Sequence, residues 1–121
     1  MRNRGQLKEK EIVDLAKSCA RILDEKKARD TVIVNLMKIH SYLDYFVIST
    51  ANSLIHCRSL AREVRELFKN AGLSERSRTQ TESAWIVLDY SEIVVHIFTK
   101  EMRDYYQLEK LWADAEKIVF R

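Results

Sequence analysis

Carboxylates, histidines and cysteines are the side chains with which this chain could perform acid–base, nucleophilic or metal chemistry. Asp44 and Asp89 stand at the ends of apolar runs, where acid–base pairs can form, but Asp at a strand boundary more often bonds its own turn. His96 lies inside an apolar run without a second ligand at zinc-binding spacing, which favours a hydrogen-bonded core residue. Cys19 and Cys57 also lack such a partner and are expected to be core residues. We therefore predict no catalytic residue, no metal site and no cofactor.

The composition excludes the common nucleotide-binding motifs. The 121 residues include two glycines, Gly5 and Gly72, where an average usage of about 7% would give roughly eight. A P-loop needs two glycines with a Gly-Lys-Ser/Thr ending, and a dinucleotide fingerprint needs three glycines, so neither motif is present. The net charge is only +3, and Lys and Arg are dispersed among Asp and Glu. This pattern argues against strong nonspecific binding of nucleic acid.

A group of aromatic residues with a nearby arginine is a stronger functional signal, because Trp, Tyr and Arg dominate binding hot spots. The group comprises Trp85, Tyr90, Tyr105, Tyr106, Trp112 and Arg103. Helical spacing near the end of the chain predicts that Tyr105, Leu108 and Trp112 face inward. Arg103 and Tyr106 would then lie on faces that a partner can reach, although core packing competes for about half of the group. Tyr106 is thus a better interface candidate than Trp112.

Hydrophobic periodicity predicts the elements that must hold these side chains. A helix over about residues 7–27 is followed by strands at 31–37 and 44–50, and by a helix from Asn52 or Ser53 to Gly72. A short edge strand at 78–82, strands at 85–89 and 93–98, and one or two helices over 102–120 complete the chain. The order αββαβββα predicts a single α/β domain over residues 1–121, with a mixed sheet of about five strands flanked by helices.

The last two strong strands are close enough for a tight antiparallel hairpin. A turn centred on Tyr90 and Ser91 would pair Trp85 with His96. The two side chains would then share one face of the sheet.

Five segments spread over most of the chain carry a recognisable pattern. They are KARD at 27–30, DYFVIST at 44–50, WIVLDY at 85–90, VVHIF at 94–98 and RDYYQLEKLW at 103–112. Each is weakly specific alone, but five in this order resemble the ribosomal silencing factor family, also called the Iojap-related family. The resemblance implies a nucleotidyltransferase-like fold without that enzymatic activity.

The resemblance also implies a partner. Members would bind the large ribosomal subunit through ribosomal protein uL14, at the face that meets the small subunit, and repress translation by steric exclusion. The family's Trp-Ile/Val strand start corresponds to Trp85 and Ile86, which we expect at the ribosomal contact. Arg103, Tyr106 and Glu109 are added from the matching C-terminal motif.

Three positions depart from the family pattern because they lack its glycines. Ala51 stands in the Thr-Gly-x-Ser turn, Ser83 in the Glu-Gly pair and Ser91 in the Asp-Tyr-Gly-Asp hairpin. Each loss makes a positive φ costlier, so the turn geometry near these residues is the least certain local feature.

Two other functions remain open from the sequence. A nucleotidyltransferase enzyme would need clustered carboxylates for metal ions, and only the isolated Asp44 and Asp89 are found. A direct rRNA-binding module would need a concentrated basic face, although the basic residues between positions 2 and 10 offer a minor rRNA contact. A homodimer through the apolar hairpin face and the terminal helix is a further hypothesis.

No apolar stretch approaches the roughly 20 residues that cross a bilayer, so we expect a cytoplasmic protein without membrane contact.

Overall fold

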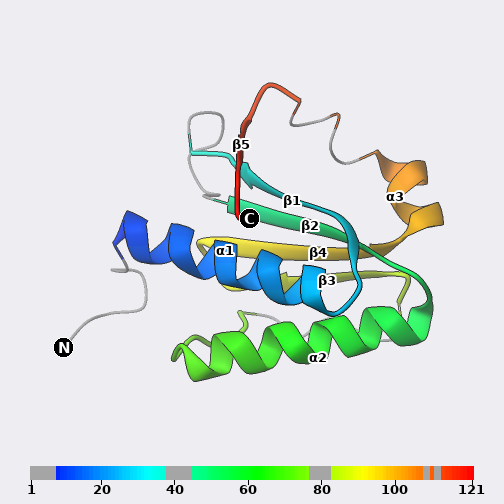
Figure 1. Ribbon diagram of the computed structural model, residues 1–121, viewed down its shortest axis with the longest axis horizontal. Helices are drawn as coiled ribbons and strands as arrows, with labels where there is room; N and C mark the ends of the chain where they lie inside the picture. The colour runs from blue at the N-terminus through cyan, green and yellow to red at the C-terminus, as the bar shows by residue number, and fades with distance from the viewer. Residues whose placement is uncertain (1–7, 38–44, 77–82, 108–109, 111–112) are drawn as a thin grey trace.

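The computed structural model describes residues 8–37, 45–76, 83–107, 110 and 113–121 (Figure 1). Its elements are α1 (Glu9–Glu25), β1 (Arg29–Asn35), β2 (Tyr45–Ala51), α2 (Leu54–Asn70), β3 (Trp85–Asp89), β4 (Ile93–Thr99), α3 (Lys100–Tyr106) and β5 (Glu116–Ile118). The predicted class, one α/β domain with a mixed five-stranded sheet flanked by helices, is confirmed. The predicted edge strand at 78–82 lies outside the described residues. No helix of the described part is long and apolar enough to cross a membrane.

The strands lie in the order β3-β4-β2-β1-β5. Two antiparallel pairs, β1 with β2 and β3 with β4, are each formed by consecutive strands. The pairs meet where β2 runs parallel to β4, and β5 adds to the free edge of β1. The sheet therefore consists of two local antiparallel pairs joined by one parallel seam.

The two faces of the sheet are covered differently. Figure 1 shows α1 and α2 running along one face, while α3 lies beyond the end of β4. Alternate strand residues such as Ile86, Leu88 and Ile97 join the core beneath α1 and α2. A second cluster, which includes Phe46 and Phe98, occupies the opposite face and takes in residues of α3 and the C-terminal segment. The strands therefore have apolar residues on both faces, as their sequence predicts.

The two long helices form where the sequence predicts them, because each has an apolar stripe and defined ends. The Ser53 hydroxyl accepts a hydrogen bond from the His56 N–H at 3.0 Å and so caps α2, as expected. At the other end Gly72 has φ +83°, and the N–H groups of Gly72 and Leu73 donate to the carbonyls of Lys69 and Phe68. This is a Schellman motif, which explains why α2 stops at the glycine.

The C-terminal region differs from the prediction of helix over 102–120. The helix α3 ends at Tyr106, because Gln107 adopts a left-handed conformation with φ 49° and its N–H donates to the Arg103 carbonyl. Farther on, Glu116–Ile118 pairs with β1 as an edge strand. The helical prediction is wrong for these residues because pairing with the open edge of β1 overrides a weak local periodicity.

The β3–β4 hairpin forms as predicted, but its register is displaced by two residues. Trp85 pairs with Phe98, and His96 pairs with Val87. Because side chains alternate along a strand, a shift of two keeps every side chain on its predicted face. Trp85 and His96 therefore share a face, as expected, although they are diagonal neighbours rather than direct partners.

Of the three positions that lack a family glycine, only Ser91 requires the conformation that glycine favours. Ser91 has φ +74° in the hairpin turn, and its N–H donates to the Asp89 carboxylate at 2.9 Å. Ala51 lies in β2, and neither it nor Ser83 has a positive φ. Among the three positions, the conformational free-energy cost of replacing a family glycine therefore falls on Ser91, in the hairpin turn.

Candidate functional site

An exposed aromatic surface lies where β3 meets α3, and we define it as Trp85, Tyr105 and Tyr106. The Trp85 and Tyr106 ring centroids are 4.7 Å apart, and the Tyr105 and Tyr106 rings meet edge to face at 5.0 Å. Tyr105 is 77% exposed and Tyr106 is 45% exposed, whereas Trp85 is partly buried. Large aromatic side chains that remain in solvent are good anchors for a protein partner.

Trp85 is supported from inside the protein. Its indole N–H donates to Nδ1 of His96 at 3.1 Å, and its ring centroid lies 4.9 Å from that of Phe98. His96 is buried, and this burial lowers its pKa to about 4. The imidazole is therefore neutral at physiological pH, which keeps Nδ1 available as an acceptor. The prediction that His96 is a hydrogen-bonded core residue is confirmed.

The helix that carries both tyrosines is fixed by a buried arginine. Arg103 is 7% exposed, and its Nη1 donates to the Asp30 carbonyl at 2.6 Å and to the Thr50 hydroxyl at 2.8 Å. These acceptors belong to β1 and β2, so Arg103 connects α3 to the strands beyond the parallel seam. The side chain of Arg103 thereby sets the position of α3, and α3 sets the position of Tyr106.

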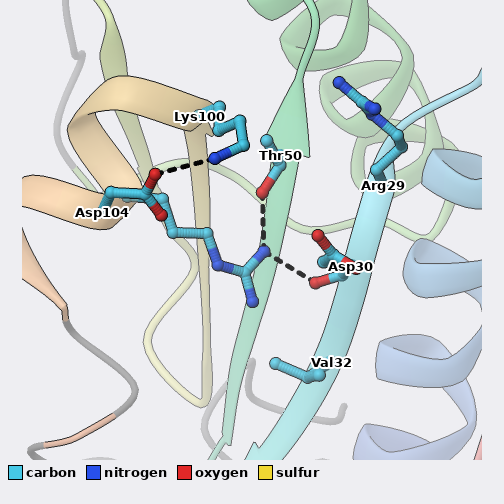
Figure 2. Close-up of a pocket in the computed structure, with 7 residues that line it drawn as sticks. Arg29, Asp30, Val32, Thr50, Lys100 and Asp104 are labelled. Carbon is cyan, nitrogen blue, oxygen red and sulfur yellow. Dashed lines mark hydrogen bonds and ion pairs between the residues drawn. The ribbon is translucent and has the colours of Figure 1, made fainter.

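Arg103 lies beside a cavity of about 370 Å³, shown in Figure 2. The lining residues are Arg29, Asp30, Val32, Thr50, Lys100, Arg103 and Asp104. Lys100 and Asp104 form an exposed ion pair at 2.9 Å, and the dashed lines to Thr50 and Asp30 mark the two arginine hydrogen bonds (Figure 2). Three cations and two carboxylates nearly neutralise each other here, so the cavity has no strong preference for an anion.

The predicted contact residues are divided by the structure into exposed and buried positions. Trp85 and Tyr106 lie together at the surface, but adjacent residues of a strand point to opposite faces. Ile86 is consequently fully buried beneath α2, and the expectation that it lies at a surface contact is wrong. The expected accessible position of Arg103 is also wrong, because its hydrogen bonds draw it inward. Glu109 lies outside the described residues.

Tyr105 was assigned to the interior by helical spacing, and this assignment is wrong. Tyr105 is 77% exposed, and α3 ends one residue after it, at Tyr106. Leu108 and Trp112 were predicted to share its stripe. Both of those residues lie outside the described part of the chain. Thr99 caps α3 by accepting from the Met102 N–H at 3.4 Å, and this cap is the one sequence signal for a short helix starting here.

The groups that could do chemistry have structural roles where they are described. The Asp89 carboxylate accepts from Ser91 in the turn and lies 4.0 Å from Arg76, as expected for a strand-end Asp. Cys19 and Cys57 are buried free thiols, which confirms their predicted place in the core. No group of three or more His, Cys, Asp or Glu residues within the described ranges could hold a metal ion. Asp44 is outside those ranges.

Comparison with known families identifies the functional class of the chain, which the geometry of the aromatic surface does not specify. The family model described as "Ribosomal silencing factor during starvation" matches residues 9–121. The chain belongs to the ribosomal silencing factor family. The family is named for a regulatory action on ribosomes and not for a catalysed reaction. Ribosome-associated regulation of translation is therefore the functional class of this chain.

Individual relatives of the ribosomal silencing factor family agree with this assignment. The ribosomal silencing factor of Halalkalibacterium halodurans is 32% identical over 87% of this chain and 91% of its own length. A mouse relative, "Mitochondrial assembly of ribosomal large subunit protein 1", is 27% identical over 75% of this chain, which spans 42% of that protein. A crystal structure of a protein from Bacillus halodurans, 30% identical, superposes with a TM-score of 0.75 and covers 92% of this chain and 99% of that one.

Proposed function

We propose that this chain represses translation by binding the large ribosomal subunit through ribosomal protein uL14 and so excluding the small subunit. The observation that carries the proposal is the aromatic surface on a family member: Trp85, Tyr105 and Tyr106 are clustered, and the two tyrosines are exposed. The name of the mouse relative, which refers to the ribosomal large subunit, supports the choice of subunit. Exclusion of the small subunit requires occupancy of a shared face and no chemistry.

The aromatic surface is of a suitable kind for such a contact. A standard protein interface buries about 800 Å² on each partner, and a few aromatic anchors supply most of its free energy. Tyr106 packs against the Trp85 ring, which limits the orientations of Tyr106 before a partner arrives, and Tyr105 meets Tyr106 edge to face. Rings that are already ordered lose less entropy on binding.

Sedimentation of purified ribosomal subunits through a sucrose gradient tests the proposal. The wild-type chain should lower the joined-particle peak and travel with the large subunit. Tyr106→Ala and Trp85→Ala should each weaken binding by roughly tenfold or more, since hot-spot truncations cost about 2 kcal/mol. Val119→Ala is a matched control, because Val119 is 77% exposed and follows β5, at the edge of the sheet opposite to β3.

Each outcome of this experiment is informative. If the wild type leaves subunit joining unchanged at saturating concentration, the proposed function is refuted. If Val119→Ala weakens binding as much as Tyr106→Ala, the loss is not specific to the aromatic surface, and the proposed contact is wrong. Direct titration of purified uL14 with the wild type and with Tyr106→Ala then tests whether this ribosomal protein is the partner.

A minor rRNA contact is a second part of the proposal, and the folded chain favours it more than the sequence does. Cations at spacings of four, three and four fall on one side of α2, namely Arg58, Arg62, Arg65 and Lys69. Arg65 is already paired with Glu75 at 2.6 Å, while Arg62 and Lys69 are exposed. Binding to the subunit should weaken with salt, and Arg62→Ala should reduce that dependence. If Arg62→Ala binds with the same salt dependence as the wild type, the proposed RNA contact through α2 is wrong.

A homodimer remains a separate proposal. Every residue of β4 except Thr99 is buried within the chain, so the apolar hairpin face offers little surface for a second copy. The exposed rings of α3 are the part of the predicted dimer surface that stays accessible. A light-scattering mass equal to one chain at high concentration would exclude the dimer.

A further inference from the structure

We propose that His96 is a positioning residue for the aromatic surface: its imidazole acceptor fixes the Trp85 indole in the orientation that a partner contacts. This inference rests on the proposed function, because it assigns a role at the same surface. It concerns a residue that is buried and that no ribosomal partner can touch.

The geometry of the sheet makes this pairing specific. Val87 lies directly opposite His96 on β4, and Trp85 lies diagonally across from it, on the same face. Diagonal neighbours are within reach of long aromatic side chains. The hydrogen bond of 3.1 Å joins the one donor of the indole ring to Nδ1 of the imidazole. Rotation of the indole about its own axis would break this bond, so the bond selects one orientation of the ring.

The imidazole is itself held in place. Its ring centroid lies 4.5 Å from that of Phe46 and 6.0 Å from that of Phe98, in the cluster opposite α1 and α2. Because Nδ1 accepts from Trp85, the proton of the neutral ring is on Nε2. Burial lowers the pKa of His96 to about 4, which preserves this tautomer at physiological pH.

Packing alone gives no reason for a histidine at this position. The buried Nε2 has no hydrogen-bond partner in the part of the chain that the structure describes, and leaving a buried donor unpaired is unfavourable. An apolar residue of similar size would fill the same space without that cost. What an apolar residue lacks is the acceptor for Trp85, and this acceptor is the property that the proposal assigns to His96.

The consequence for the surface follows from the position of Trp85. It lies on β3, at the edge of the sheet, and contacts Tyr106 at 4.7 Å. A fixed Trp85 indole therefore gives Tyr106 a fixed neighbour. In this way the buried His96 influences the orientation of both the Trp85 and the Tyr106 rings. Preorganisation of this kind strengthens binding by reducing the entropy lost on association.

Two matched substitutions separate positioning from packing. His96→Asn keeps an acceptor oxygen near the place of Nδ1, and His96→Leu keeps the approximate volume without any acceptor. The indole N–H signal of Trp85 in a ¹H–¹⁵N spectrum, assigned with Trp85→Phe, reports the hydrogen bond directly. We expect protection from hydrogen exchange in the wild type and in His96→Asn, and exchange about tenfold faster or more in His96→Leu.

The same variants are then titrated with purified large ribosomal subunits. His96→Leu should bind roughly tenfold more weakly than the wild type, and His96→Asn should stay within about threefold, since preorganisation and not contact is changed. Circular dichroism confirms that both variants fold. Rescue by Asn but not by Leu is the result that a merely structural histidine would not give.

Other outcomes overturn the proposal. If His96→Leu exchanges its indole proton quickly but binds the subunit as the wild type does, the orientation of Trp85 has no role in binding. If His96→Leu retains the protection, the hydrogen bond is not what orders the ring. Failure of the wild type to bind the large subunit refutes the proposed function and with it any docking role, while the exchange experiment still shows whether His96 fixes the indole.

Discussion

Replacement of Arg103 by methionine tests whether this residue is a structural connection or a surface anchor. Methionine has a similar length and fills the space along the arginine stem, but it cannot donate a hydrogen bond. The change removes the donor to the Asp30 carbonyl at 2.6 Å and to the Thr50 hydroxyl at 2.8 Å. Thr50 is buried, and its hydroxyl would lose the arginine donor.

The magnitude follows from these two bonds. Hydrogen bonds to a charged group contribute about 1.5–3 kcal/mol each, and the saved desolvation of the buried guanidinium offsets part of the loss. We expect Arg103→Met to lower the free energy of unfolding by about 3 kcal/mol. For a domain of this size that corresponds to a fall in Tm of roughly 10 °C.

Urea unfolding followed by circular dichroism measures this free energy, and Lys100→Met serves as the matched control. Lys100 forms an exposed ion pair with Asp104 on the same helix, so its loss should cost less than about 0.5 kcal/mol. A loss below about 1 kcal/mol for Arg103→Met, together with weakened binding to the large subunit, would refute the structural role. Arg103 would then be the partner contact that the sequence predicted.

Three further predictions concern the turn, the buried histidine and the thiols. Ser91→Gly should raise the free energy of unfolding in urea by about 0.5–1 kcal/mol, because glycine relieves the strain of the positive φ at some entropic cost. Ser83→Gly is the control and should not stabilise the protein, because Ser83 has no positive φ. Between pH 4 and 6.5 the unfolded chain binds a proton at His96 that the native chain excludes. Wild-type stability should therefore fall by on the order of 3 kcal/mol more than that of His96→Leu as the pH drops through this range, measured by thermal unfolding. Burial raises the pKa of the Cys19 and Cys57 thiols, so a thiol reagent such as Ellman's should modify them at the rate of unfolding; rapid labelling of the native chain would contradict their burial.

The regular elements were predictable because their signals are local. The stripe of α1, the Ser53 cap, the Gly72 stop and the apolar runs of β1 to β4 each depend on a few neighbouring residues, and each lies close to its predicted place. The face shared by Trp85 and His96 was also predictable, because alternation along a strand survives a change of register by two.

The remaining features depend on contacts between distant residues. Nothing local marks the left-handed Gln107, and β5 forms only because β1 offers an open edge to it. Arg103 is buried by acceptors 73 and 53 positions away in the sequence. For Ile86, in contrast, alternation next to Trp85 was sufficient to predict burial, and the family motif was given more weight than that simple rule.

The parallel seam between β2 and β4 also has a kinetic consequence. Each antiparallel pair joins consecutive strands and can form early, whereas the seam requires the pairs to meet across the intervening α2 and is the slower, long-range step. Arg103 reaches β1 and β2 from the helix that follows β4, so its hydrogen bonds can form only after the pairs have met. Interactions completed after the folding barrier mainly slow unfolding. We therefore expect the hydrogen bonds of Arg103 to slow unfolding and to leave the rate of folding nearly unchanged.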